Sequence, residues 1–139
     1  MRTVTRGVSL LLIGSAAASC AVAPQPGRSA KAETHFQKLI AGKVAGQPLS
    51  CLPSYRSNDM VVIDDQTVAF REGSRRVWVS TLRSGCSNLG SGHYALVTRQ
   101  GGGSGLCRGD IAQVADLTNG ITVGSCVFGD FVPYTRAPG

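Results

Sequence analysis

The chain has few of the residues from which catalytic and metal sites are usually built. Of its 139 residues only two are histidines, and its five cysteines include no Cys-x-x-Cys pair. That pair is the usual signature of a zinc site, so we expect no bound metal and no cofactor. The Gly-x-Ser-x-Gly nucleophile elbow is missing too. We therefore expect a non-enzymatic protein in which no residue has a catalytic role.

Long apolar runs are equally scarce, and the clearest one lies at the N-terminus. It extends from Gly7 to Ser19, follows Arg2 and Arg6, and is too short to span a bilayer as a helix. A charged start and a short apolar run ending in small residues are typical of a secretory signal peptide, which we assign to residues 1–19.

Cys20 directly follows this segment, and Ala17–Cys20 resembles a bacterial lipobox, although leucine is more common where Ala17 stands. We expect acyl chains on Cys20 to anchor the protein to a membrane. Ala21 replaces the Asp that retains many lipoproteins in the inner membrane, which favours the outer membrane and a periplasmic orientation. Cleavage after Ala16-Ala17-Ala18 is the alternative, and it would give a soluble periplasmic protein.

The net charge of +6 is unevenly distributed. After the signal peptide, most of the excess lies between Arg28 and Lys43, and the remaining body is close to neutral. A nucleic-acid-binding domain needs a basic face with aromatic side chains that stack on bases. We therefore expect no nucleic-acid partner, and we expect the basic segment to meet an anionic membrane surface.

We expect residues 20–45 to contain the lipid-anchor candidate, a tether with Pro and Gly, and one short helix over Ala30–Ala41. Phe36 and Ile40 share one face of this helix. Because so short a helix is marginal in water, we expect that face to pack on the following domain, with contact to a membrane as the alternative.

Residues 46–139 predict a disulfide-stapled β domain. Its centre is Met60–Leu82, three short strands joined by turns at Asp65-Gln66 and Glu72–Arg75. Further strands are expected over His93–Arg99, Leu106–Asp116 and Ile121–Phe128, with a hairpin at Asn119-Gly120 and a tail, Gly129–Tyr134, that covers an edge or closes the core. The predicted fold class is all-β, a small antiparallel barrel or sandwich of about six strands with one short N-terminal helix.

Four cysteines remain after Cys20, namely Cys51, Cys86, Cys107 and Cys126. An even number of cysteines in an exported chain predicts two disulfides. Three pairings are possible. We expect the local one, Cys51–Cys86 around the Met60–Leu82 strands and Cys107–Cys126 around the final hairpin.

Three groups of residues could carry chemistry. His93, nearby serines (Ser84, Ser87 and Ser91) and Asp110 could form a triad, whereas the other histidine, His35, lies on the predicted helix. Asp64-Asp65 could act as a carboxylate pair, but neighbouring strand residues point to opposite faces, so a turn is expected. Arg108-Gly109-Asp110 matches an adhesion tripeptide, but we expect a turn at the start of a strand.

Several stretches together resemble a bacterial family of small exported proteins catalogued as a domain of unknown function, number 6491. They are Val62–Arg71, Val77–Leu82 before Cys86, Leu106–Asp110, and Cys126–Tyr134, in which Phe128 stands where the family more often has leucine. The resemblance covers about Cys51 to Tyr134. It implies export, the cysteine framework and a β fold, and it implies no activity, cofactor or catalytic residue.

The sequence leaves three hypotheses about function. The first is an exported cell-envelope protein, a lipoprotein with a binding or structural role and an envelope protein as its partner. The second is a periplasmic inhibitor of a lysozyme-like hydrolase, because Ser91-Gly92-His93-Tyr94 resembles the loop with which small inhibitors plug that active site. The third is a small hydrolase that uses His93.

Overall fold

The structure, a computed structural model, describes residues 27–53, 59–84, 86–99 and 105–137. The elements are, in chain order, α1 (Ala30–Ile40), β1 (Val44–Ala45), β2 (Met60–Asp64), β3 (Thr67–Glu72), β4 (Arg76–Arg83), the 3-10 helix η2 (Leu89–Ser91), β5 (Tyr94–Thr98), β6 (Ile111–Asp116) and β7 (Thr122–Thr135). The predicted signal peptide, the tether up to Pro26 and the lipidation candidate Cys20 lie outside the described residues.

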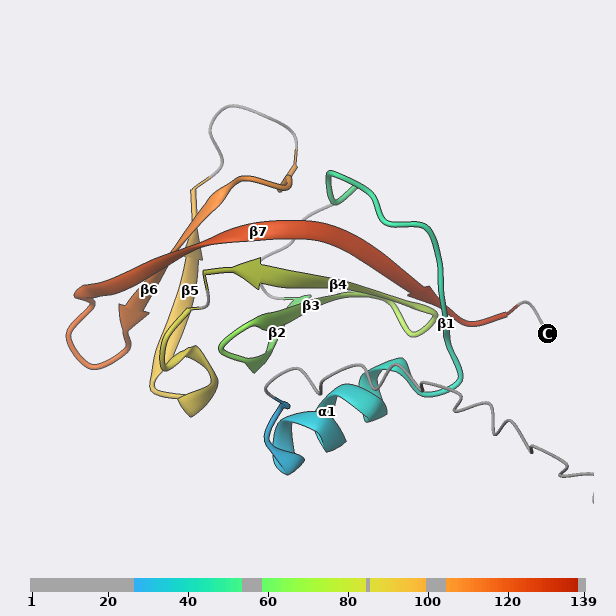
Figure 1. Ribbon diagram of the computed structural model, residues 1–139, viewed down its shortest axis with the longest axis horizontal. Coiled ribbons are helices and arrows are strands. Elements are labelled where there is room, and N and C mark those ends of the chain that lie inside the picture. The colour runs from blue at the N-terminus through green and yellow to red at the C-terminus, as the bar shows by residue number, and fades with distance from the viewer. Residues whose placement is uncertain (1–26, 54–58, 85, 100–104, 138–139) are drawn as a thin grey trace, which may run out of the picture.

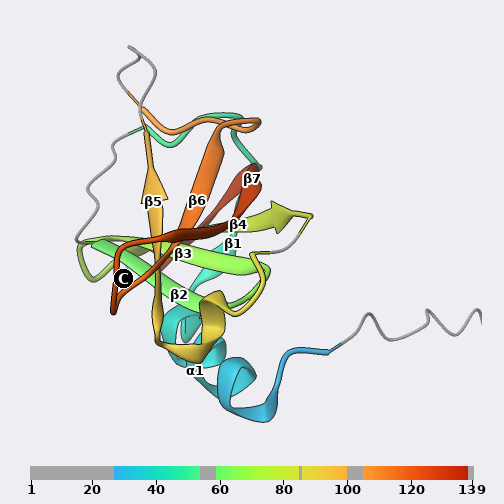
Figure 2. The ribbon, with the colours of Figure 1, turned by 90° about the vertical axis from the view of Figure 1, so that its left-hand side faces the viewer.

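The strands form one antiparallel sheet that curls into a half-barrel (Figure 1). Its order is β2-β3-β4-β7-β6-β5, and the short β1 pairs with one end of β7. Because β7 returns beside β4, strands β4 to β7 form a Greek key. In Figure 2, β5 and β6 run steeply across the direction of β2 and β3. The predicted all-β fold, with about six strands and one short helix, is confirmed.

The helix α1 begins and ends close to the predicted residues. The Ser29 side chain accepts a hydrogen bond from the Ala32 amide at the N-terminus, and Gly42 takes a positive φ of 66° just after the C-terminus. Phe36 is buried, and its ring meets the Tyr134 ring of β7 edge-on, with the centroids 6.1 Å apart. The expected packing of the helix on the β domain is therefore confirmed.

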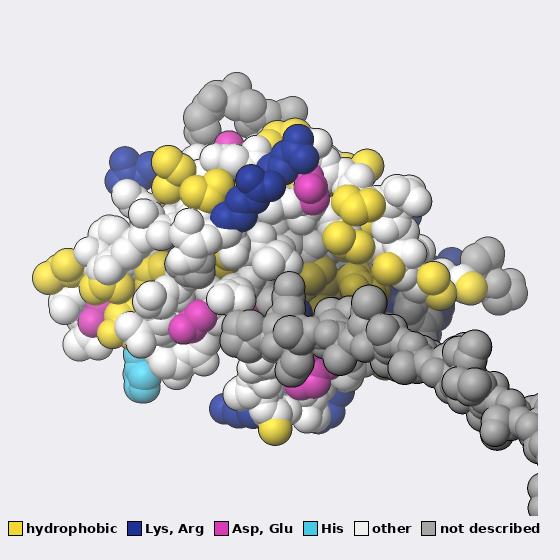
Figure 3. All heavy atoms as spheres, in the orientation of Figure 1, with side chains coloured by type: hydrophobic (Ala, Val, Ile, Leu, Met, Phe, Trp, Pro, Cys, Tyr) yellow, Lys and Arg dark blue, Asp and Glu magenta, His cyan; other side chains and the backbone are white. Residues whose placement is uncertain are grey.

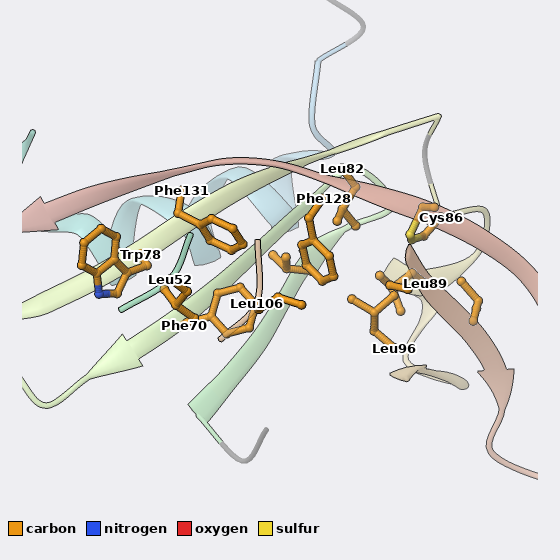
Figure 4. Packing of buried hydrophobic residues seen from close by; sticks show 14 residues of the cluster. Leu52, Phe70, Trp78, Leu82, Cys86, Leu89, Leu96, Leu106, Phe128 and Phe131 are labelled. Carbon is orange, nitrogen blue, oxygen red and sulfur yellow. A yellow bond between two sulfur atoms is a disulfide. The ribbon is translucent and has the colours of Figure 1, made fainter. Parts of the chain in front are cut away.

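Alternation along β3 and β4 creates two cores, one on each face of the sheet. Val68, Phe70, Trp78 and Leu82 belong to the inner cluster, whose centre is a group of three phenylalanines (Figure 4). The intervening residues point to the outer face, where they meet α1. This outer cluster contains Ala69, Val77, Val79, Ile63, Ala32 and Phe36. A single alternating pattern thus supports both the half-barrel interior and the helix.

Both predicted turns of the first three strands are present. Asp65 and Gln66 join β2 to β3, and the second turn, between β3 and β4, contains Gly73 with a positive φ of 62°. The Asn119-Gly120 hairpin is also confirmed, since the Gly120 amide donates to the Asp116 carbonyl oxygen at 2.8 Å. Apolar residues on either side of this hairpin face solvent, with Leu117 65% and Ile121 61% exposed.

The chain after Cys126 differs from the prediction. Instead of ending at Phe128, the last strand continues to Thr135 and pairs with β4 along most of its length. The tail does close the core through Phe131, which is fully buried, but it does so as part of a central strand. Pro133 obscured this, because proline inside a run predicts an edge strand or no strand.

The start of β6 also differs from the prediction. Leu106–Asp110 was assigned to the strand, but β6 begins at Ile111. Cys107–Asp110 forms a turn in which Gly109 has a positive φ of 95° and the Asp110 carboxylate accepts a hydrogen bond from the Cys107 amide at 2.7 Å. The tripeptide Arg108-Gly109-Asp110 is therefore a turn before a strand, as expected.

The predicted disulfide pairing is wrong, although all four cysteines are paired. The bridges are Cys51–Cys107 and Cys86–Cys126. Local pairing assumed that sequence neighbours are also neighbours in space. In the Greek key, β4 lies beside β7, so Cys86, shortly after the end of β4, meets Cys126 on β7. The segment of Cys51 forms a β-bridge with the segment of Cys107. The Met60–Leu82 strands are therefore not closed by a disulfide of their own.

Two disulfides place the domain among proteins of oxidising compartments outside the cytoplasm. Among the described residues there is no helix long and apolar enough to cross a membrane.

Candidate functional site

The candidate site is a cleft of about 830 Å³ beside the N-terminal half of α1. Its helix side consists of the segment from Gly27 to Glu33 together with His35, and its sheet side is the β2–β3 turn with Thr81 and Gly90. Figure 2 shows α1 and η2 at the same end of the sheet, where this cleft lies. Its volume lies within the range of small-ligand sites in proteins.

Arg28 joins the two walls of the cleft. Its Nε donates to Asp64 Oδ2 at 3.0 Å, and its other nitrogens donate to Glu33 Oε2 at 3.3 Å and Thr67 Oγ1 at 3.2 Å. The guanidinium also lies over the Phe36 ring, 4.1 Å from the ring centroid. Arg28 was expected in a basic segment that meets a membrane, but its charge is instead used inside the domain.

Replacing Arg28 by alanine is expected to reduce the free energy of unfolding by about 1–2 kcal/mol, because a cation–π contact and two half-exposed ion pairs are lost together. Urea unfolding of the wild type and the variant measures this difference. Lys31→Ala, at an exposed position in the first turn of α1, is the matched control and should change stability by less than about 0.5 kcal/mol. An equal loss in both variants would show that Arg28 does not join the helix to the sheet.

The Asp64-Asp65 pair is a structural turn, as expected. Asp64 Oδ1 accepts the Gln66 amide at 2.8 Å while its other oxygen holds Arg28. Asp65 accepts the amides of Asn88 at 3.0 Å and Gly90 at 2.7 Å, which fixes η2 against the turn. Every carboxylate oxygen of the pair therefore has a structural partner.

Glu33 is the one carboxylate of the cleft with a clear pKa shift. The hydrogen bond from Gln37 at 2.7 Å, followed by the bond from Arg28, lowers the pKa of Glu33 below its ordinary value. Because the pKa of Glu33 is lower in the folded than in the unfolded chain, the ionised carboxylate stabilises the fold at pH values above the unfolded pKa. This contribution is lost as the pH falls through the folded pKa.

Gln37→Ala is expected to raise the pKa of Glu33 toward its ordinary value, since the largest cause of the shift is removed. An NMR titration of the Glu33 carboxyl carbon measures the change. Thr34→Ala is the control, because Thr34 is exposed on the same helix and its hydroxyl bonds to the Ala30 carbonyl oxygen. An unchanged Glu33 pKa in Gln37→Ala would contradict the assigned cause.

The two histidines lie in different places and do not combine with the predicted partners. His35 lines the cleft, whereas His93 is exposed just before β5. Asp110 precedes β6 at its other end, since Tyr94 pairs with Asp116 and Thr98 with Ala112. At about 3.3 Å per residue, roughly 20 Å separates His93 from Asp110. The triad of His93, Asp110 and a nearby serine is therefore not assembled.

Lys31 and His35, on the helix side of the cleft, have donors that are available to a partner. Lys31 is exposed and His35 half-exposed, and neither side chain bonds to another described residue. The described part of the chain contains no group of three or more potential metal-ligating side chains. Lys31 and His35 can therefore donate hydrogen bonds to acceptor groups of a partner, whereas Asp64, Asp65 and Glu33 are bonded within the domain.

Sequence reasoning found the Asp64-Asp65 turn but missed the cleft. Its central residue, Arg28, lies 36 positions before Asp64, and no local pattern indicates that contact. The Asp110 carboxylate and the Asp130 carboxylate, which binds Arg108 at 3.0 Å, both lie away from the cleft.

No family model, curated protein or solved structure matches the chain. The resemblance to the family catalogued as domain of unknown function 6491 therefore stays a prediction from the motifs in Val62–Arg71, Val77–Leu82, Leu106–Asp110 and Cys126–Tyr134.

Proposed function

We propose that this chain is a non-enzymatic binding protein of the bacterial cell envelope. In this proposal, residues 1–19 direct export and Cys20 carries the lipid that holds the protein at the outer membrane, facing the periplasm. The half-barrel presents the cleft between α1 and the β2–β3 turn to an envelope protein. The two disulfides support the export step, because such bridges persist in oxidising compartments.

The observation that carries the binding role is the state of the acidic groups in the cleft. Asp64, Asp65 and Glu33 are all held by hydrogen bonds or ion pairs within the domain. These bonds fix the acidic side chains in the walls of the cleft, and a preformed cleft that offers a few hydrogen-bond donors to a ligand is typical of a binding site. Lys31 and His35 supply such donors at the helix side of the cleft.

Surface charge favours a protein partner over nucleic acid. On the face shown in Figure 3, Lys and Arg side chains are scattered among acidic and apolar ones. Arg28, Arg76 and Arg108 are each paired with a carboxylate. A continuous basic surface is what sequence-independent nucleic-acid binding requires.

Chemical crosslinking in intact envelopes, followed by pull-down, tests this function. The wild type is expected to return one reproducible partner. Cys20→Ala should move the protein from the outer-membrane fraction to the soluble periplasm and reduce recovery of a membrane-bound partner. Absence of any reproducible partner, with the protein present in the envelope, would contradict the binding role. An unchanged location of Cys20→Ala would contradict the anchor alone.

A second candidate, inhibition of a lysozyme-like hydrolase, is favoured by the conformation of Ser91–Tyr94. Ser91, Gly92 and His93 are exposed, and Gly92 takes a positive φ of 83° in a tight turn. Asp65 fixes the preceding η2, so this loop is held rigidly at the surface. Excess purified domain should then inhibit lysozyme, and His93→Ala should weaken the inhibition. Unchanged lysozyme activity would remove this candidate.

A further inference from the structure

The two disulfides differ in their access to solvent. Cys86 and Cys126 are 1% and 2% exposed and belong to the inner hydrophobic cluster. Cys51 is exposed and Cys107 half-exposed, outside that cluster. Thiol–disulfide exchange requires a thiolate to reach a sulfur atom, so its rate depends strongly on access. Cys86–Cys126 is therefore protected from external thiolates unless the domain opens, whereas Cys51–Cys107 can be reached in the folded domain.

The segments joined by Cys51–Cys107 are also held together without the disulfide. The Leu52 amide donates to the Leu106 carbonyl oxygen at 2.8 Å, and the Arg108 amide donates to that of Ser50 at 2.6 Å. Leu52 and Leu106 are buried in the inner cluster next to the bridge. These contacts should keep both segments in place when the sulfur–sulfur bond is broken, so the bond can open without unfolding the domain.

We propose that Cys51–Cys107 is a thiol-exchange site at which an external thiolate attacks Cys51 Sγ. The bond between the two cysteine sulfurs breaks, a mixed disulfide forms at Cys51, and Cys107 leaves as a thiolate that takes a proton from water. Where the attacking molecule is a dithiol, its second thiolate attacks the mixed disulfide. Cys51 is then released reduced, and the dithiol is oxidised to its disulfide.

The direction of attack follows from the surroundings of the two sulfurs. Cys51 is the more exposed residue. Cys107 is fixed by the turn in which Asp110 accepts its amide, so it stays in place as the leaving group. A monothiol therefore forms a mixed disulfide at Cys51, and alkylation of the Cys107 thiolate traps it before Cys107 can attack back and expel the monothiol. The buried Cys86–Cys126 bridge meanwhile preserves the fold. This reactivity does not depend on the cleft or on the anchor at Cys20.

The test uses the folded full chain with two probes, reduced glutathione as a monothiol and dithiothreitol as a dithiol, followed by alkylation and peptide mapping by mass spectrometry. Glutathione should be found on Cys51 in the molecules in which alkylation has trapped the Cys107 thiolate. With dithiothreitol, Cys51 and Cys107 should be alkylated at least about ten-fold faster than Cys86 and Cys126, because the buried pair reacts only through opening. Equal rates, earlier labelling of the buried pair, or glutathione on Cys107 would overturn the proposal.

The variant Cys51→Ser with Cys107→Ser provides the control. Cys86 and Cys126 of this variant should not be labelled with either probe in native buffer and should become reactive only in denaturant. Circular dichroism checks that this variant is folded. If it does not fold, the labelling order in the wild type still decides the proposal, since both disulfides are compared within one molecule.

Discussion

Replacing Phe128 by alanine is expected to lower the free energy of unfolding by about 3–5 kcal/mol, the usual loss for a large aromatic residue removed from a packed core. Phe128 is fully buried, and its ring centroid lies 6.0 Å from that of Phe131 and 6.3 Å from that of Phe70. The substitution leaves a cavity where β7 crosses the centre of the sheet. Equilibrium unfolding in urea measures the loss.

Val123→Ala is the matched control for this prediction. Val123 lies on the same strand but is 52% exposed, so its truncation should change stability by less than about 0.5 kcal/mol. A small loss in Phe128→Ala, or equal losses in the two variants, would show that β7 does not form the centre of the core. The continuation of β7 past the predicted strand end would then be in doubt.

Removing the buried disulfide with Cys86→Ala and Cys126→Ala is expected to lower the free energy of unfolding by about 3–5 kcal/mol, because a loop closed by residues 40 apart is released in the unfolded chain. Each alanine also leaves space in the inner cluster. Guanidinium unfolding under non-reducing conditions measures the change.

The exposed disulfide is the comparison for this variant. Cys51→Ala with Cys107→Ala opens a longer loop, between residues 56 apart. The free energy of unfolding should fall by about 4 kcal/mol from loop entropy, with little further loss from packing. Both double variants should therefore be clearly less stable than the wild type. A loss below about 1 kcal/mol for the buried pair would indicate that the observed pairing does not constrain the chain as the loop-entropy model requires.

Local features were predictable from the sequence because their signals lie within a few residues. The Ala30–Ile40 helix has a capping serine before it and a glycine after it, and Asn119-Gly120 specifies a hairpin. The alternation of Val68, Phe70, Trp78 and Leu82 with their neighbours indicated two faces. The sequence pattern did not show that both faces are buried, because the burial of the outer face depends on the helix that covers it.

Long-range features were not predictable, because loop lengths do not specify which strands pair. The local disulfide pairing assumed a simple meander, and the insertion of β7 beside β4 made it wrong. Pro133 concealed the continuation of that strand. In the cleft, Asp64-Asp65 was visible as a turn, but its partner Arg28 was assigned to a basic segment, since no local pattern joins residues 36 apart.

The proposed binding role is tested most directly by a photo-crosslinking amino acid placed at Gln66, on the sheet side of the cleft, and compared with the same group at Ser74. Both residues are exposed, but Ser74 lies in the turn at the other end of β3, about 20 Å away along the strand. Binding in the cleft predicts one crosslinked envelope protein at Gln66, none at Ser74, and loss of the product in Lys31→Glu. Identical products at both positions, or none at Gln66, would contradict it.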